Sequence, residues 1–293
     1  MTIAIAAGIL VLAVATALAV PTALQWRRHR GFTANTSAHQ VLSDSHASWI
    51  VDHALKVLVV ACQREQRHVP GVVMVVLHEN SIAVHVASPT AHPPAPWRTS
   101  ASGLVWTAEL LALQAAPLTP ATTNPFTGIV TLGVGQAGRV FIDLNQAHGL
   151  VSIEGDPVSR RRIAAHWIAE AAIRPWGTTD ADLVGLDANA APHPAEIAAV
   201  QNLASTVASG AVGLTFVAHL PNDATSAQLV HALESPDCRW PVVVVSAVRD
   251  ARWRFTAHTN GWVTSDFLPA ARWDRVSARP PTVATPARPG LPS

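Results

Sequence analysis

The stretch from Gly128 to Ala165 constrains the fold more than any other part of the chain. Its residue types change in the order strand, turn, strand, strand and helix. Apolar and β-branched runs occupy 129–134, 140–144 and 150–154, and the turn Gly-Gln-Ala-Gly separates the first two. An amphipathic pattern over 158–173 then predicts a helix. We therefore expect a hairpin, followed by a buried strand that leads into a helix.

The turn between this buried strand and its helix reads Glu-Gly-Asp-Pro over 154–157. Asp156 is a suitable N-cap, and Pro157 is favoured at the first helical position. A phosphate-binding loop needs a glycine-rich turn followed by Lys and Ser or Thr, yet the only lysine is Lys56. The turn is therefore predicted to serve the helix start, and nucleotide hydrolysis is not expected.

Strands and helices continue to alternate after this unit. Strand patterns occur at 183–186, 213–219 and 241–248, with helix patterns at 194–207 and 224–233. Such alternation is typical of a mostly parallel sheet covered by helices on both faces. The predicted fold class is therefore α/β, preceded by a small α+β subdomain. The strand-Gly-Asp-Pro-helix unit around Gly155-Asp156-Pro157 distantly resembles a degenerate P-loop NTPase.

The subdomain begins with an amphipathic helix over Ser45–Gln66, whose apolar positions include Trp49 and Leu55. Two β-branched runs at 72–77 and 82–86 predict a hairpin, and proline-rich stretches follow. Near the carboxyl end, 253–257 and 261–264 predict a closing hairpin at the sheet edge. The expected domains are a transmembrane anchor (1–25), a juxtamembrane linker (26–45), the small subdomain (46–125), the α/β domain (126–275) and a disordered proline-rich tail (276–293).

The amino-terminal segment from Thr2 to Leu24 contains no charged residue. A run of that length is what a helix needs to cross a bilayer. Trp26 and a cluster of arginines follow it. The positive-inside rule then predicts a single-pass plasma-membrane protein with its body in the cytoplasm. A cleaved signal peptide is the alternative, with Ala17-Leu18-Ala19 as the cleavage site.

The run over 129–157, followed by a helix and Pro175-Trp176, resembles a region of actinobacterial membrane proteins. Those proteins often carry a LysM or a bacterial transcriptional activator domain as well. Pro96-Trp97 and Trp253-Arg254 are similar to the same pattern, which covers about residues 49 to 265. The resemblance implies a membrane-anchored cytoplasmic α/β domain, without either accessory module.

Composition and spacing exclude several kinds of chemistry. The net charge of +1 with only 13% charged residues gives no basic stripe, so no nucleic-acid partner is expected. Cys62 and Cys238 match no metal-binding spacing, and the histidines are scattered, so neither a metal nor a cofactor is predicted. Asp143 and Asp156 flank one strand and would suit an acid–base pair, but structural roles explain both more simply.

A non-catalytic scaffold or protein-interaction module is the function that these patterns favour. Two alternatives stay open: a ligand-sensing or enzymatic domain that uses the crevice near Gly155 and Ser246, and an exported cell-envelope protein. Exposed aromatic residues and arginines are common in protein interfaces. The candidate contact residues are Trp176, Trp240, Trp262, Arg160, Arg161 and Arg162.

Overall fold

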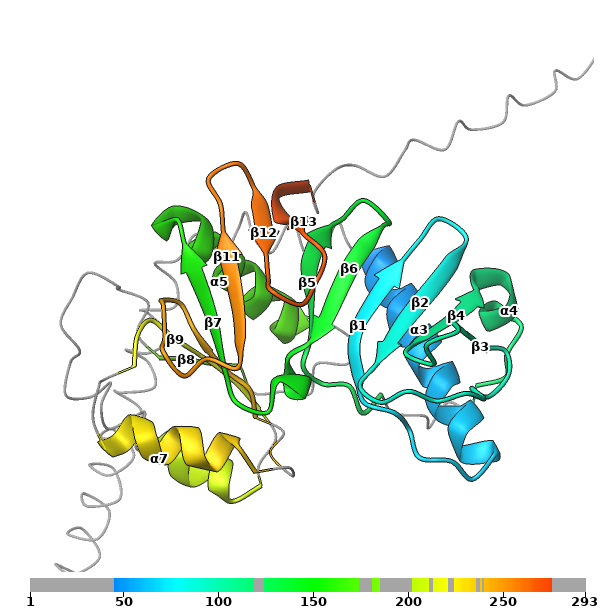
Figure 1. Cartoon of the computed structure of the whole chain (residues 1–293), viewed down its shortest axis with the longest axis horizontal. Coiled ribbons are helices and arrows are strands. Elements are labelled where there is room, and N and C mark those ends of the chain that lie inside the picture. Colours follow the sequence, from blue (N-terminus) through cyan, green and yellow to red (C-terminus); the bar gives the residue numbers. More distant parts are fainter. Residues whose placement is uncertain are drawn as a thin grey trace, which may run out of the picture.

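The structure of the protein is a computed structural model that describes residues 45–118, 124–173, 181–184, 202–210, 213–220, 224–235, 238 and 240–275 (Figure 1). Helices of these residues are α3 (Ser45–Arg64), α4 (Leu110–Gln114), α5 (Pro157–Ile173), α7 (Ala224–Leu233), a helix over 202–208, and the 3₁₀ helices η1 (Leu144–Ala147) and η2 (Trp273–Arg275). The strands are β1 (Val72–Leu77), β2 (Ser81–Val86), β3 (Arg98–Thr99), β4 (Val105–Glu109), β5 (Ile129–Val134), β6 (Arg139–Asp143), β7 (Leu150–Gly155), β8 (Ala181–Val184), β9 (Leu214–Val217), β10 (Val242–Val244), β11 (Trp253–Ala257), β12 (Trp262–Thr264) and β13 (Ala271–Arg272).

These strands form one mixed sheet in the order β3-β4-β2-β1-β6-β5-β13-β12-β11-β7-β10-β9-β8. The sheet has two halves, which lie side by side in Figure 1. From β3 to β5 every pairing is antiparallel, whereas β11, β7, β10, β9 and β8 are parallel. The hairpins β11–β12 and β12–β13 join the halves.

The predicted fold, a mostly parallel sheet with helices on both faces, is wrong. Of the twelve pairings between described strands, eight are antiparallel and four are parallel. Short connections explain the difference, because tight turns allow antiparallel pairing whereas parallel neighbours need a long crossover. The resemblance to a degenerate P-loop NTPase fold fails for the same reason. The hairpin predicted at the edge exists, but β11 also pairs with β7, so it lies inside the sheet.

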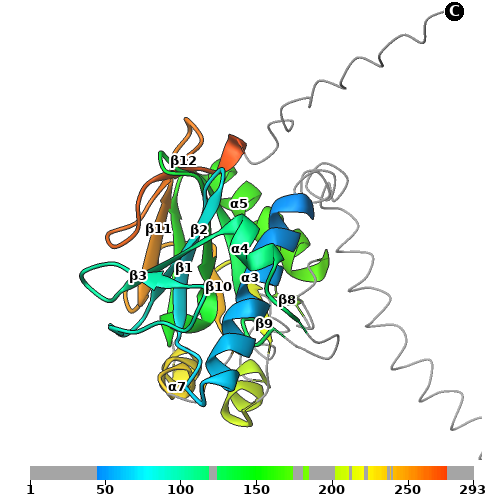
Figure 2. The same cartoon turned by 90° about the vertical axis from the view of Figure 1, so that its right-hand side faces the viewer.

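In the antiparallel half, α3 packs on one face of the strands. Val75, Val84 and Phe141 are level with one another across β1, β2 and β6, and they share a core with Leu55 and Leu58 of α3. Alternation along β1 turns Val75 to this face and its neighbours to the other. Figure 2 shows α3 and α5 on the same side of the sheet.

The second core lies at the centre and is shared by both halves. Trp167 of α5 is 1% exposed, and its ring meets that of Phe255 in β11 edge to face, with 5.7 Å between the centroids. Burying each such ring stabilises the fold by about 1.5–3 kcal/mol. Residues of β5 and β6 belong to the same cluster, so α5 connects the two halves.

The parallel half has a third core on its other face. Val242 and Val244 of β10 face Leu229 and Leu233 of α7, together with Leu203 of the helix over 202–208. Val243, between them in sequence, belongs to the central core under α5. Successive β10 residues therefore contribute to different cores, as the period of a strand requires.

The transmembrane helix predicted over 2–24, the linker that follows it and the tail from residue 276 lie outside the described residues. None of the helices that the structure describes is long and apolar enough to span a membrane. This finding contradicts the prediction of a single-pass plasma-membrane protein with its body in the cytoplasm.

Candidate functional site

The turn between β7 and α5 is closed by backbone contacts. Gly155 has a φ of +91°, and a Cβ there would lie 2.3 Å from the carbonyl oxygen of Ala257 in β11. The Asp156 N–H donates to the same oxygen at 2.9 Å. Asp156 Oδ2 accepts from the Ser159 N–H at 2.7 Å, which makes it the N-cap of α5. Hydrogen bonds from the Ser159 side chain and then from its N–H lower the pKa of Asp156. The turn serves the helix start, as its sequence predicts.

The crevice predicted near Gly155 and Ser246 would lie at the carboxyl ends of β7 and β10. These strands are parallel, with Val244 level with Ser152, and Ser246 follows two residues after the last residue of β10. Glu154 Oε1 accepts from the Ser152 hydroxyl at 2.9 Å and lies 3.6 Å from Arg254 Nη1. The Glu154 carboxylate therefore already has partners in its own sheet, Ser152 and Arg254.

Asp143, the last residue of β6, and Asp156, which follows β7, both have structural partners. Asp143 is 2% exposed, and its Oδ1 accepts from the Asn145 N–H at 3.1 Å at the start of η1. Asp156 caps α5 in the same manner. Each carboxylate thus supports the start of a different helix.

The three candidate arginines lie in the first turns of α5 and differ in exposure. Arg160 and Arg161 are half-buried, whereas Arg162 is exposed. Arg161 Nε donates to the carbonyl of Pro157 at 3.0 Å on its own helix. Of the three, only Arg162 is exposed.

The candidate tryptophans lie in three different settings. Trp176 lies outside the described residues. Trp240 is 7% exposed, and its Nε1 donates to the Thr215 hydroxyl at 2.9 Å beneath Gly213. Such burial leaves little of its ring for a partner. Trp262 in β12 is half-buried.

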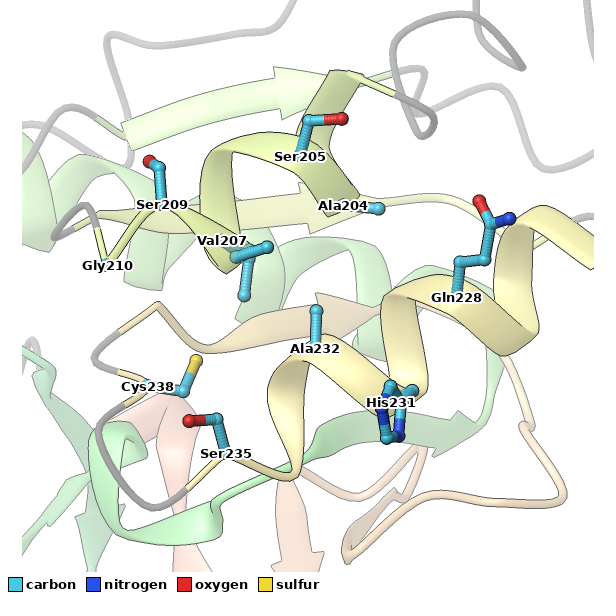
Figure 3. A pocket seen from close by; sticks show the side chains of 11 residues that line it. Ala204, Ser205, Val207, Ser209, Gly210, Gln228, His231, Ala232, Ser235 and Cys238 are labelled. Atoms are coloured by element: carbon cyan, nitrogen blue, oxygen red, sulfur yellow. The ribbon is translucent and has the colours of Figure 1, made fainter.

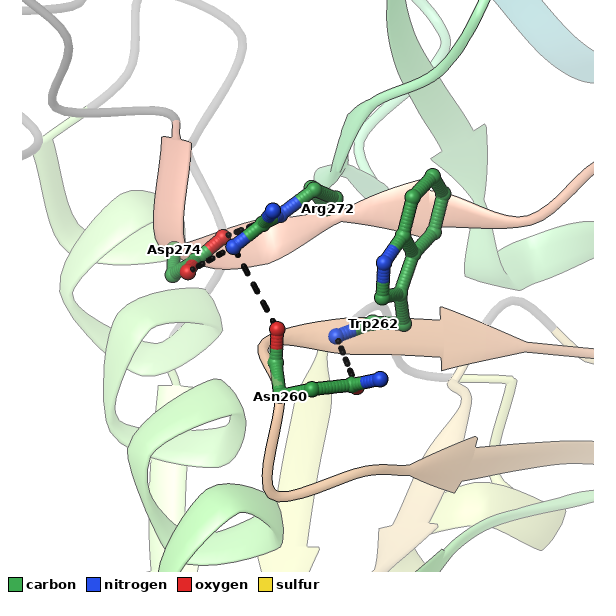
Figure 4. A network of polar contacts seen from close by, with 4 residues as sticks. All are labelled: Asn260, Trp262, Arg272 and Asp274. Carbon is green, nitrogen blue, oxygen red and sulfur yellow. Dashed lines mark hydrogen bonds and ion pairs between the residues drawn. The ribbon is translucent and has the colours of Figure 1, made fainter.

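Trp262 belongs to a polar network on the hairpins that join the two halves (Figure 4). Arg272 of β13 donates to both carboxylate oxygens of Asp274, at 3.1 and 2.7 Å, and to the Asn260 carbonyl at 3.3 Å. Its guanidinium lies 5.8 Å from the centre of the Trp262 ring, within reach of a cation–π contact. The network holds β12 to β13. The Arg272 guanidinium already contacts Asp274, Asn260 and Trp262 of the same chain.

Two exposed apolar side chains, which sequence reasoning missed, lie on α3 and α4 near the point where these helices meet. Trp49 is 52% exposed and Leu111 is 79% exposed. The Trp49 ring stacks on His53 at 5.4 Å, and His53 Nε2 lies 3.0 Å from the carbonyl oxygen of Leu113. We name Trp49, His53, Leu111 and Leu113 the α3–α4 corner.

Helical periodicity placed Trp49 on the buried side of α3, and this prediction is wrong. The signal that contradicts it is present in the sequence. Trp49 shares its stripe of the helix with His53 and Lys56, four and seven residues on, and both are polar. A stripe with two such neighbours faces water more often than core.

A groove lies between the helix over 202–208 and α7 (Figure 3). It has a volume of about 650 Å³ and opens beside the amino ends of β9 and β10. Ligands of open α/β sheets bind at the carboxyl ends of the strands. The groove is therefore at the opposite end of the strands from Gly155 and Ser246.

Among the described residues, no three acidic, histidine or cysteine side chains are grouped as metal ligands would be. Comparison with family models, with curated proteins and with solved structures finds no match to this chain.

Proposed function

We propose that the described part of the chain is a non-catalytic protein-interaction module that binds its partner through the α3–α4 corner. The exposure of Trp49 carries the proposal. The chain has ten tryptophans, of which Trp26 and Trp176 lie outside the described residues. Among the others Trp49 alone is exposed rather than buried or half-buried. Tryptophan is among the residues that contribute most to binding energy in interfaces.

The corner also holds the indole in a defined position. Stacking on His53 orients the ring, and the contact between His53 and the Leu113 carbonyl ties α3 to α4. Binding therefore costs less side-chain entropy than it would for a freely rotating tryptophan. Leu111, on α4, adds an aliphatic side chain. The partner that fits this corner offers an apolar cleft large enough for an indole ring.

The buried carboxylates Asp52 and Glu170 support a structural rather than a catalytic role for these two acids. Asp52 is 5% exposed, and its oxygens accept from Lys56 Nζ at 2.7 Å and Asn124 Nδ2 at 3.2 Å. Glu170 is fully buried and bonded to Thr131. A catalytic acid or base needs a free face toward a substrate.

Site-specific photo-crosslinking tests this function. The full chain would be made in its own cells with p-benzoylphenylalanine in place of Trp49, of Leu111 or of Arg162. We expect the same protein adduct from positions 49 and 111, and none from 162, which samples the arginine candidates on α5. Leu104, 40% exposed elsewhere on the antiparallel half, serves as the apolar control position.

Two outcomes would overturn the proposal. One is an adduct at 162 or 104 but not at 49 and 111. The other is an adduct at 49 that survives Leu111→Ser, since a partner held at the corner loses an aliphatic contact there. The side chains of Trp49 and Leu111 are both exposed, so substitution at either should change the free energy of unfolding by no more than about 0.5 kcal/mol. Circular dichroism of each variant checks this.

A further inference from the structure

The groove between the helix over 202–208 and α7 is unusual for two helices that cover one face of a sheet. Packed helices normally approach to about 8–10 Å, with side chains that fill the space between them. Here the large side chains, Leu203, Leu229 and Leu233, belong to the core against the sheet. Small residues line the space between the helices, namely Ala204, Ala208, Gly210 and Ala232.

The resulting space is within the usual range of ligand sites, which hold about 300–1,000 Å³. Ala204, Val207 and Cys238 are buried and form its floor, while the rim is exposed. In Figure 3 the Val207 and Ala232 side chains point toward each other across it. The groove therefore has an apolar floor.

Polar groups ring this floor. Hydroxyls come from Ser205, Ser209 and Ser235, an amide from Gln228 and an imidazole from His231. Each of these groups can both donate and accept a hydrogen bond, except the Ser209 hydroxyl, which donates to the Thr206 carbonyl at 2.7 Å and so offers only an acceptor. None of the lining residues that the structure describes carries a carboxylate, ammonium or guanidinium group.

The two helices also end at this groove. Residues 204–210 are the last turn of one helix and its exit, and residues 228–235 are the last turns of α7 and its exit. The Gly210 N–H closes the first helix on the Val207 carbonyl at 3.1 Å. Helix carboxyl ends carry partial negative charge, which disfavours an anion nearby.

We propose that this groove is a binding site for an uncharged small molecule that carries hydroxyl or amide groups on an apolar body, of the size of a monosaccharide or a nucleoside. The apolar floor takes the body of the ligand, and the rim takes its polar groups. The site is remote in sequence from the α3–α4 corner, and its argument uses none of the corner residues. It therefore stands independently of the proposed protein partner.

Cys238 provides a direct reporter, because it lies in the groove floor and the chain has only one other cysteine, the fully buried Cys62. The rate of iodoacetamide alkylation at Cys238 would be measured in the full chain by peptide mass spectrometry. The probes are glucose and adenosine. Their charged counterparts, glucuronate and adenosine monophosphate, are tested at the same concentrations.

We expect at least one uncharged probe to slow alkylation of Cys238 severalfold and saturably, while its charged counterpart has little effect. Ala232→Leu fills the groove and should abolish the protection. Ala227→Leu is the matched control, because Ala227 is exposed on the same helix and is not part of the lining. It should leave the protection unchanged.

The proposal fails if no probe protects Cys238, if charged and uncharged probes protect equally, or if protection survives Ala232→Leu. Should the leucine variant not fold, Gln228→Ala takes its place. Gln228 is exposed, so its truncation leaves the fold intact. Protection must then weaken severalfold, and unchanged protection counts against the site.

Discussion

Glu170 of α5 holds Thr131 of β5 by two hydrogen bonds. Its carboxylate accepts from the Thr131 N–H at 2.6 Å and from the Thr131 hydroxyl. One turn earlier on α5, Trp167 Nε1 donates to the Thr131 carbonyl at 2.7 Å. Two side chains of a helix thus satisfy both backbone groups of one strand residue, as a neighbouring strand would.

Replacing Glu170 by glutamine should destabilise the protein. The substitution replaces one carboxyl oxygen by an amide group, which donates, so the Thr131 hydroxyl must turn to accept. Loss of a buried acceptor costs about 1–3 kcal/mol. Urea denaturation measures the change in the free energy of unfolding. Glu234→Gln, at an exposed position after α7, is the control and should change it by no more than about 0.5 kcal/mol. Equal effects of the two substitutions would contradict the role of Glu170.

Gly155→Ala should cost more than Gly210→Ala, although both glycines have positive φ, of +91° and +75°. A Cβ at Gly210 meets nothing within 4 Å, so alanine there costs only the left-handed backbone, about 1–2 kcal/mol. At Gly155 the Cβ would also strike the Ala257 carbonyl, and we expect a loss of at least about 3 kcal/mol. Thermal or urea unfolding compares the variants. A smaller loss at Gly155 would show that β7 and β11 move apart easily.

Asp156 should make stability depend on pH at the acidic end. Hydrogen bonds from Ser159 lower its folded pKa beneath the ordinary 3.8. A depressed folded pKa stabilises the protein above the unfolded pKa, and this contribution is lost as the pH falls through the folded value. Asp156→Asn keeps a cap that does not titrate. The stability difference between wild type and this variant should therefore shrink between pH 5 and pH 2, about the range of that titration. A difference that stays constant over this range would contradict the assignment.

The two thiols should react slowly in the folded protein. Burial raises the pKa of Cys62 to about 11 and also raises the pKa of Cys238. Only the thiolate attacks an alkylating reagent, so at pH 8 about one Cys62 side chain in a thousand is reactive. In urea the thiol has its ordinary pKa of 9.0, so about one in ten is thiolate at pH 8. We therefore expect Cys62 to react about a hundredfold more slowly in buffer than in urea. Peptide mass spectrometry measures both rates. Rapid native labelling of Cys62 would show that α3 opens from the sheet.

Local patterns predicted where strands and helices lie far better than which strands pair. The run over 72–77 and the helix start at Pro157 follow from β-branched residues and from an aspartate cap, which act within a few residues. Pairing is decided between distant residues. Nothing near Val75 indicates that Phe141 lies beside it, and nothing near Trp253 indicates that Val151 does.

The candidate site shows the same division. Arg161 and Asp156 act within their own turn of α5, and the interpretation of Asp156 followed from its neighbours. Trp240 looked available because it lies near loops, but Thr215, distant in sequence, receives its N–H inside the core. The groove whose floor includes Cys238 depends on two helices that lie on one face of the sheet, and local sequence does not reveal this arrangement.

The short strand β13 gives the sheet a seam. A single residue pair, Arg272 with Val134, closes the sheet between β5 and β13. Continuity across the middle of the molecule therefore depends more on α5 than on the backbone ladder. The helix α5 packs on strands of both halves. If its packing loosened, the antiparallel and parallel halves could tilt against each other while each stayed folded. A partner bound to one half would then affect the other through that helix and through the β12–β13 hairpin.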